Sequence, residues 1–366
     1  MASDQALSQR TAANQAAARW TRGLLSALSK AGCVIHACSH CSEQVWPKGM
    51  LWPGVKADFD AQYPLQYTRY LNLPYIRFPW LDKAYRRMVS AEIQATQPDV
   101  VLAYNLESYH YALADIFRRF NIPWVPIILD QPDPRRDDWK LFKQQIQGAS
   151  GAVFVSDWGF NYAPLEIPKL HLDGGVTQVA ESKVTSGSDR KRIVYSGKYN
   201  HAYGGLDFLF AMFANVQRQD CELVLTGKDV HHQLPRYLAR EPRARYLGYL
   251  SREALHQVYA DAAVFVNPGN PDSHDNRMNF PSKLLDYLAY GKPIVSTWTA
   301  GMAREYCGLL TSPFAYTPQA YGGALEAKLE LSVEACATLQ TKILNWGARH
   351  TWDCQAQRLL AWLQAL

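Results

Sequence analysis

The chain has 366 residues, which is long for a single hydrophobic core, so two domains are expected. An apolar fraction of 48% and a charged fraction of 19% are typical of a folded protein and exclude a disordered chain. The net charge of +5 indicates acidic partners but is too small to require nucleic acid, and we predict no nucleic-acid partner.

No apolar run approaches the ~20 residues that span a bilayer, and the N-terminus lacks the apolar core of a signal peptide. The seven cysteines are odd in number and irregularly spaced, which argues against a disulfide framework. These features predict a cytoplasmic protein, with a peripheral position at the inner membrane face as an open alternative.

The first predicted element is a long helix within residues 9–32, which ends at Gly32. The segment CVIHAC (Cys33–Cys38) predicts a strand after it. The polar stretch MASDQALS predicts no strand before the helix, so the strand that should open a nucleotide-binding unit is missing. Either the chain is trimmed, or its sheet begins with a segment that the pattern does not reveal.

Three short segments contain possible metal ligands, but none has a convincing spacing. HACSHC (His36–Cys41) offers four soft ligands in a pattern that matches no zinc motif. DFD (Asp58–Asp60) does not follow a strand of a nucleotide-binding unit, which favours a surface loop. His231 and His232 stand at the start of a predicted helix, where a capping or solvated role is favoured. We therefore predict no metal site.

The segment from Tyr63 to Arg87, YPLQYTRYLNLPYIRFPWLDKAYRR, is dense in aromatic and basic residues. One interpretation is an extended loop with a short helix packed on a sheet. The other is a patch for peripheral membrane contact, because aromatic rings and arginine suit the headgroup region of a bilayer.

From Asp99 onward, apolar runs alternate with amphipathic helices, as in βαβ units. The expected strands include DVVLA, WVPIILD, GAVFVS, RIVYSG, ELVLTG and AVFVNPG. The polar stretch at residues 181–191 lies near the midpoint and predicts a domain boundary. We predict a first domain over residues 1–175, a second domain over 176–345, and a C-terminal helix over 346–366 that packs back toward the first domain.

The stretch NFPSKLLDYLAYGKPIVST (Asn279–Thr297) predicts a capped helix, a turn and a buried strand. Pro281 and Ser282 suit the first positions of a helix, and Gly291 suits its end. The leucines form one apolar stripe. Lys283 and Asp286 do not fit a packing role.

The glycine-rich segment YSGKYNHAYGGLDFL (Tyr195–Leu209) follows a predicted strand and opens a helix. It lacks the signatures of a Walker A loop and of a G-x-G-x-x-G turn. The hypothesis of a dinucleotide-dependent dehydrogenase therefore lacks its main sequence evidence. Loops after parallel strands gather at the carboxyl edge of a sheet, which predicts one crevice for Lys198, Lys283 and Asp286. Two lysines suit a diphosphate, and a carboxylate suits the vicinal hydroxyls of a ribose.

These segments, with ELVLTGKD, RYLGYLSREALHQVYADAAVFVNP and LHLDGGV, resemble the family 4 retaining glycosyltransferases, in the branch with a Pro-Ser-Lys-x-x-acidic helix start. The resemblance covers about residues 99–345. It implies an α/β chain of GT-B fold, with two Rossmann-like doubly wound domains that face a central cleft. It also implies transfer of a hexose-type sugar from a UDP-, GDP- or dTDP-sugar to a glycan or lipid-linked acceptor, in polysaccharide or glycoconjugate biosynthesis, without a tightly bound cofactor.

The same resemblance implies roles for individual residues. Asp286 matches the second glutamate of the family motif, which holds the ribose, and Tyr249 and Leu250 lie where main chain reads the base. The implied donor-binding set is Asn14, Gly197, Lys198, Thr226, Tyr249, Leu250, Asn279, Phe280, Pro281, Ser282, Lys283 and Asp286. The implied catalytic set is Lys198, Lys283, Asp130 and Asn105.

Two departures from the family pattern keep other functions open. The first motif glutamate would fall at Met278, where Asp275 or Asn276 could substitute, and LDQPD (Leu129–Asp133) occupies the place of a histidine-containing loop. The alternatives are a sugar-nucleotide epimerase of the same fold and a non-catalytic nucleotide-binding partner subunit.

Overall fold

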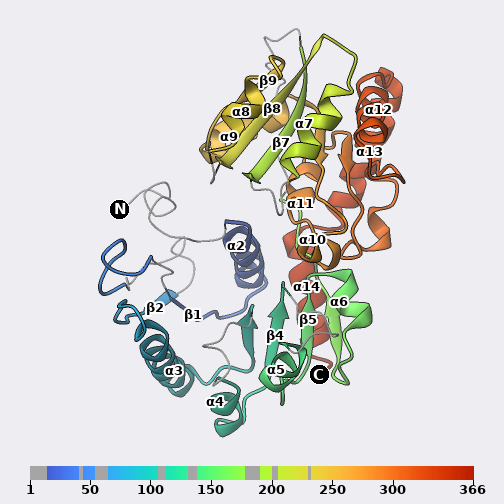
Figure 1. Cartoon of the computed structure of the whole chain (residues 1–366). Coiled ribbons are helices and arrows are strands. Elements are labelled where there is room, and N and C mark those ends of the chain that lie inside the picture. The colour runs from blue at the N-terminus through green and yellow to red at the C-terminus, as the bar shows by residue number, and fades with distance from the viewer. Residues whose placement is uncertain are drawn as a thin grey trace. The chain divides into compact units, whose positions relative to one another are not determined.

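The computed structural model describes residues 15–40, 44–53, 65–105, 113–130, 138–177, 190–199, 205–229 and 232–366. The chain forms two compact units (Figure 1). Unit 1 contains the described residues up to Val155, then Gly159–Gly175 and Trp352–Leu366, and unit 2 contains Ser156–Trp158 and Val176–Thr351. All strand pairs in the sheets of the described chain are parallel, so the predicted α/β class is confirmed.

Unit 1 contains a four-stranded sheet and a separate strand pair. The four strands follow one another in chain order, β3-β4-β5-β6, and the pair is β1-β2. The strand bounds are β1 Ala37–His40, β2 Leu65–Thr68, β3 Val101–Tyr104, β4 Trp124–Ile128, β5 Ala152–Phe154 and β6 Lys169–His171. Every residue of β4 and β5 is buried, as expected for the middle of a parallel sheet covered on both faces. The helices are α2 Gln15–Lys30, α3 Arg77–Thr96, α4 Leu113–Arg119, α5 Asp138–Gln145, α6 Asp157–Tyr162 and α14 Trp352–Leu363, with α6 beginning in the short segment that belongs to unit 2.

The N-terminal part of unit 1 differs from the sequence prediction in two places. The strand predicted at Cys33–Cys38 begins only at Ala37, where β2 supplies a parallel partner. Val34 is 88% exposed, so the apolar run before β1 has no sheet to pack on. The segment Tyr63–Arg87, for which one interpretation was a loop with a short helix, instead contains β2 and the first part of the 20-residue helix α3, which continues to Thr96.

Helix α14 returns to unit 1 at the end of the chain and packs on α2. The ring of Trp352 meets that of Trp20 edge-on at a centroid distance of 5.6 Å. Gly23 and Gly175 lie directly against Trp352, and a Cβ on either glycine would overlap with it. Small residues at these two positions are therefore what allows the indole to fit.

Unit 2 is a five-stranded sheet of order β11-β10-β7-β8-β9, of which strands β7, β8 and β9 are labelled in Figure 1. Its strands are β7 Lys191–Tyr199, β8 Cys221–Asp229, β9 Ala244–Tyr246, β10 Ala262–Asn267 and β11 Ile294–Ser296. Its helices are α7 Leu206–Ala214, α8 Leu234–Leu238, α9 Arg252–Ala260, α10 His274–Met278, α11 Lys283–Leu288, α12 Pro318–Leu329 and α13 Val333–Ala348, with a 3₁₀ turn, η2, at Arg304–Tyr306. The chain fills one side of β7 with β8 and β9, and then the other side with β10 and β11. The direction of winding therefore reverses between β7 and β10, and ligands of such sheets bind at the carboxyl ends of the strands at this switch point.

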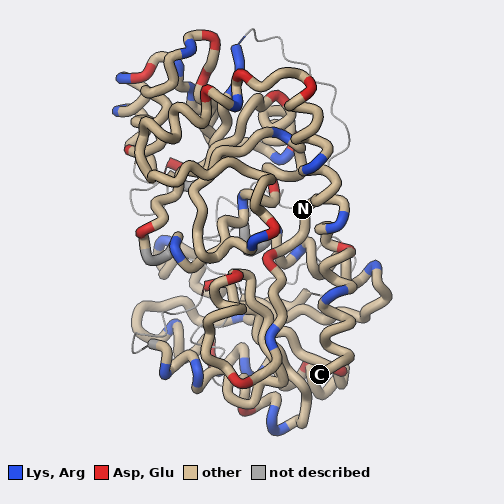
Figure 2. The backbone as a smooth tube through the Cα atoms, turned by 90° about the vertical axis from the view of Figure 1, so that its right-hand side faces the viewer, with Lys and Arg blue, Asp and Glu red and all other residues tan. Residues whose placement is uncertain are grey.

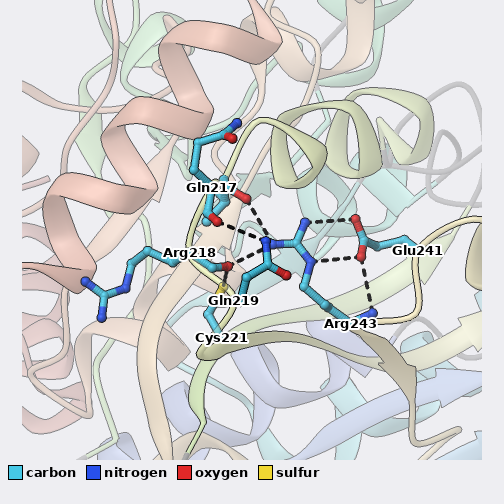
Figure 3. A network of polar contacts seen from close by, with 7 residues as sticks. Gln217, Arg218, Gln219, Cys221, Glu241 and Arg243 are labelled. Carbon is cyan, nitrogen blue, oxygen red and sulfur yellow. Dashed lines mark hydrogen bonds and ion pairs between the residues drawn. The ribbon is translucent and has the colours of Figure 1, made fainter.

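A polar network joins the opposite, amino-terminal edge of this sheet (Figure 3). The guanidinium of Arg243 pairs with both carboxylate oxygens of Glu241 at 3.0 Å and donates to the carbonyl oxygens of Val216 and Arg218 at 2.9 Å. It also lies 4.6 Å from the ring centroid of Phe213. One side chain thus ties the loop after α7 to the loop before β9, at the edge remote from the carboxyl ends of the strands.

Candidate functional site

The loops that follow β7 and β10 meet at the switch point of unit 2. Gly205, which precedes α7, has a φ of 54°, in the left-handed region that favours glycine. A Cβ on Gly205 would lie only 2.7 Å from the carbonyl oxygen of Pro268, the residue after β10. The close approach requires a glycine and brings the two strand ends into one site.

The side chain of Lys283 lies against the end of β7. Its ammonium nitrogen is 3.0 Å from the point that a Cβ on Gly197 would occupy, and 4.2 Å from the ring centroid of Tyr195. Burial lowers the pKa of Lys283, while the neighbouring Tyr287 and Asp286 act in the opposite direction through their negative forms. A desolvated cation at the end of a strand favours an anionic ligand.

Helix α11 begins differently from the prediction. Ser282 stands at the N-cap position with a φ of −52° and a ψ of −25°, and its side chain makes no capping hydrogen bond. The first turn is closed by the amide of Leu284, which donates to the carbonyl of Pro281 at 2.9 Å. The predicted apolar stripe is buried as expected. Because the helix has only six residues, the charge at its start comes from Lys283 and not from a long helix dipole.

The loop after β9 is held by hydrogen bonds from β8. The hydroxyl of Thr226 donates to the carbonyl of Gly248 at 2.8 Å, and the amide of Gly227 donates to the same oxygen at 2.9 Å. Gly248 has a φ of 73°, which turns the chain into Tyr249 and Leu250. The main chain of these two residues is therefore presented at a defined position, and the Tyr249 ring lies 5.3 Å from the ammonium of Lys228.

Asn279 and Phe280 connect α10 to α11 in tight packing. A Cβ on Gly301 would overlap with the carbonyl of Asn279, so the backbone there is closely covered. The Phe280 side chain is buried at 8% exposure and contacts the Tyr306 ring at 5.4 Å. Its ring is thus part of the core, and only its main chain remains as a candidate donor contact.

The position of the absent family glutamate is also a core position. Met278 is 3% exposed, which suits an apolar side chain. Asn276, one of the two predicted substitutes, donates its side-chain amide to the carbonyl of Asn270 at 3.0 Å. Asn276 therefore helps to shape the loop after β10.

Three tyrosines around Lys283 were not among the predicted site residues. Tyr195 supports the ammonium from below, and the Tyr287 hydroxyl accepts from the amide of Ser196 at 3.0 Å. Tyr259 bonds the Ser196 hydroxyl. The alternation of side chains along a strand could have revealed Tyr195, because it shares a face of β7 with Gly197.

In unit 1, Asn105 and Asp130 lie at the carboxyl ends of neighbouring parallel strands, β3 and β4. Asn105 has a φ of 45°, and its amide donates to the carbonyl of Ile127 at 2.9 Å. Asp130 is exposed and adds to the rise in the pKa of Tyr104, which burial mainly causes. The two candidate acceptor-side residues thus share one edge of the unit 1 sheet.

The soft-ligand cluster in unit 1 serves other contacts. His36 bonds the carboxylate of Glu92 at 2.8 Å. Burial raises the pKa of the Cys38 thiol to about 12 and lowers the pKa of His40 to about 4, with the nearby Arg77 adding to the second effect. The thiol of Cys38 is thereby disfavoured as a thiolate ligand.

Several predicted residues fall outside the part of the chain that the structure describes. These are Asn14, the side chains of Lys198 and Asp275, Cys41, Asp58–Asp60 and His231. His232 is described and is exposed at the surface. The site as described therefore rests on Lys283, Asp286, Gly197 and the loop held by Thr226.

Comparisons with known proteins identify the architecture. Residues 190–329 match the family described as Glycosyl transferases group 1. No curated protein sequence matches the chain significantly.

Three solved structures that are similar to most of the chain share 10–14% sequence identity with it. HepE of Anabaena, solved in complex with UDP, has a TM-score of 0.65 at 14% identity, over 84% of this chain and 88% of that one. The sucrose-phosphate synthase of Thermosynechococcus elongatus has a TM-score of 0.73 at 14% identity, over 95% and 92%. A putative UDP-N-acetylglucosamine 2-epimerase of Listeria monocytogenes has a TM-score of 0.62 at 10% identity, over 96% and 94%. The chain therefore has the GT-B fold, and its residues 190–329 match the glycosyl transferases group 1 family.

Proposed function

We propose that the protein is a retaining glycosyltransferase that moves a hexose-type sugar from a nucleotide-diphosphate donor to a glycan or lipid-linked acceptor. The product would belong to polysaccharide or glycoconjugate biosynthesis. The observation that carries this proposal is the ammonium of Lys283, desolvated and held against Gly197 at the switch point of unit 2.

Each part of a nucleoside diphosphate has a candidate partner in this site. Lys283, together with Lys198 at the end of β7, would bind the diphosphate, for which a cation in a low-dielectric setting is well suited. Asp286, one turn further along α11, would accept hydrogen bonds from the ribose hydroxyls. The main chain at Tyr249 and Leu250, which Thr226 holds through Gly248, would contact the base. The UDP bound to HepE supports UDP-sugars as the first donors to test.

The transfer reaction would also require positive charge beside the diphosphate, which Lys283 and Lys198 would supply. As the bond between the sugar and the diphosphate breaks, negative charge grows on the leaving phosphate oxygen. Lys283 and Lys198 would stabilise that charge where it develops. The acceptor oxygen would bond to the anomeric carbon on the face that the diphosphate leaves, and its proton would pass to the leaving phosphate oxygen. Attack on that face retains the anomeric configuration. Asn105 and Asp130 are the candidate acceptor-side contacts.

Two alternatives remain distinct in their products. A sugar-nucleotide epimerase is favoured by the Listeria monocytogenes neighbour, which has the same fold. A non-catalytic nucleotide-binding subunit is favoured by Met278, a buried apolar residue where the family motif carries a glutamate.

Product analysis with labelled sugar nucleotides separates these functions. We would incubate the protein with radiolabelled UDP-, GDP- and dTDP-sugars, with and without glycan or lipid-linked acceptors, and separate the products by chromatography. Transfer, or slow release of a sugar of unchanged anomeric configuration, supports the proposal. An epimerised nucleotide sugar indicates the first alternative, and bound but unchanged donor indicates the second. Activity should survive EDTA, since lysines supply the charge.

A further inference from the structure

Seven large apolar side chains of unit 1 are exposed in two short segments, residues 44–53 and 74–80. We call them the aromatic patch, and they are Trp46, Met50, Trp52, Tyr75, Ile76, Phe78 and Trp80. Tyr75 is 99% exposed and Phe78 is 61% exposed. The rings of Trp52 and Trp80 meet edge-on at 6.3 Å, so the two segments lie side by side. Large exposed apolar side chains that gather in neighbouring segments in this way are typical of a docking site.

The backbone under the aromatic patch is firmly held by Asn72, which is fully buried. The side-chain amide of Asn72 donates to the carbonyls of Gln44 and Met50 at 2.7 and 2.9 Å. Its backbone amide donates to Leu51 at 2.9 Å, and its carbonyl accepts from Trp46 at 3.1 Å. The backbone of residues 44–53, which carries three of the exposed side chains, is therefore held in place by hydrogen bonds to Asn72.

The charge around the aromatic patch is strongly basic. Residues 44–53 and 65–87 contain six basic side chains and one acidic side chain, a net charge of 6 − 1 = +5. Figure 2 marks the basic and acidic positions along the described backbone, where both signs occur. On α3, Trp80, Lys83 and Arg87 follow the i, i+3, i+7 spacing of one helix face, away from the buried residues Leu81 and Tyr85. The Arg77 guanidinium covers the Phe78 ring at 5.3 Å.

We propose that the aromatic patch docks on the surface of an anionic lipid bilayer. Trp and Tyr rings favour the headgroup region, and basic side chains beside them are attracted to anionic lipids. The same charge disfavours a second copy of this chain as the occupant, because two patches of +5 would repel one another. No helix in the described part of the chain is both long and apolar enough to cross a membrane.

The structure changes which residues would make the contact. Tyr70 and Tyr85, part of the segment singled out in the sequence, are 0% and 7% exposed and belong to the core. Trp46, Met50 and Trp52 come from outside that segment. The docking surface thus includes fewer residues of the segment Tyr63–Arg87 than the sequence indicates, and it also includes exposed residues of the loop 44–53.

Sedimentation with vesicles tests the proposal without any sugar nucleotide. We would compare vesicles of phosphatidylcholine alone with vesicles containing phosphatidylglycerol, at low and high salt. The protein should sediment with the anionic vesicles at low salt and be released as salt screens the charges. The variant Lys48→Gln/Lys83→Gln/Arg87→Gln should lose on the order of a hundredfold in partitioning, at about fivefold for each basic residue. The variant Tyr75→Ser/Phe78→Ser/Trp80→Ser should also bind more weakly.

Matched variants of unit 2 provide the controls. Arg240→Gln/Arg304→Gln/Lys342→Gln removes three exposed basic residues, and Phe314→Ser removes a fully exposed ring. Both should bind like the parent. The proposal is overturned if the parent stays in the supernatant with anionic vesicles, or if the control variants lose as much binding as the patch variants. Dimerisation without vesicles that the aromatic variant abolishes would show instead that the patch binds a second copy.

Discussion

The surroundings of Lys283 disfavour the charged form of its side chain. Its ammonium rests on an aromatic ring and beside backbone, and burial lowers its pKa from the usual value of 10.5. A charged group in such a setting makes the ligand-free fold less stable than an apolar residue of similar size would. Sites that must bind an anion carry this kind of cost as part of their function.

The first prediction is that Lys283→Met stabilises the ligand-free protein and impairs catalysis. The free energy of unfolding should rise by about 0.5–2 kcal/mol at neutral pH. The gain should shrink as pH rises toward 10.5, since the folded parent then loses its proton before the unfolded chain does. Turnover should fall about 100-fold, by more than donor affinity, because the leaving group is most charged in the transition state.

Urea unfolding at several pH values and steady-state kinetics check both parts. A destabilised variant would show that Lys283 has a structural role. Unchanged turnover with only a raised Michaelis constant would contradict the assignment to the leaving group.

The second prediction concerns Asp286, in the first turn of α11. Asp286→Ala should weaken UDP binding about 10- to 100-fold, because the ribose hydroxyls would lose a charged acceptor worth about 1.5–3 kcal/mol. Calorimetry with UDP measures the effect. Glu253→Ala is a suitable control, since Glu253 also lies in the first turn of a helix of unit 2. Equal affinity in parent and Asp286→Ala would remove Asp286 from the site.

At the scale of elements, the ends of β7 and β8 depend on a glycine pair. Gly227 has a φ of 125°, and a Cβ on it would overlap with the carbonyl oxygen of Gly197. The Tyr246 hydroxyl also donates to the carbonyl of Gly227 at 2.7 Å. The two strands therefore approach each other closely where the loops of the site begin.

We predict that Gly227→Ala destabilises the protein by on the order of 3 kcal/mol and weakens UDP binding, because the end of β7 must move. Gly323→Ala is the matched control. Apart from its chain neighbours and the backbone of its own helix, no described atom lies within 4 Å of its Cβ position. Since Gly323 stands inside α12, alanine there should be neutral or slightly stabilising. Urea unfolding measures the stability of both variants. Similar free energies of unfolding would contradict the prediction, because they would mean that β8 can move to accommodate the Cβ without loss of stability.

The elements differ in how far the sequence could predict them. The strands β7, β8, β10 and β11 of unit 2 were located from their apolar pattern, as expected for strands buried between helices. The short strand β9, Ala244–Tyr246, has only one buried residue and was not predicted. The region before α3 could not be resolved in this way, because β1 and β2 have four residues each and gain their stability from pairing across a long stretch of chain. Aromatic content gave no guide to burial there, since Tyr70 is fully buried and Tyr75 fully exposed only five residues later.

The site shows the same division. Lys283 and Asp286 stood out because they interrupt an apolar helix, which is visible in one segment of sequence. The contacts of Tyr195 and Tyr287 join residues about ninety positions apart, and no local pattern reports such a distance. The failure of Ser282 to cap α11 likewise depends on its backbone angles, which the residue type does not determine.

At the scale of the molecule, unit 1 is closed by a helix that follows unit 2 in the chain. Trp352 fills the space left by two glycines and contacts Trp20. A second tryptophan of α14, Trp362, lies against Gly151 at 2.7 Å from its Cβ position. The stability of unit 1 therefore depends on residues far from its other elements in sequence.

The last prediction is that Trp352→Ala destabilises unit 1 by about 2–4 kcal/mol and leaves unit 2 intact, since it removes the indole that packs on the two glycines and on Trp20. Hydrogen exchange with peptide resolution should show faster exchange in α2 and β3–β6 and unchanged exchange in β7–β11. Equal acceleration in both units would show that they unfold as one.

The packing of α14 on unit 1 also affects how the protein folds during its synthesis on the ribosome. Unit 2 is synthesised as one nearly continuous stretch and can fold as soon as Thr351 has left the exit tunnel. Unit 1 is synthesised first, but it must wait for the residues after Thr351 before α2 gains its partner. The order of completion is thus the reverse of the order of synthesis, and the face of α2 that packs on α14 lacks this partner throughout the translation of unit 2.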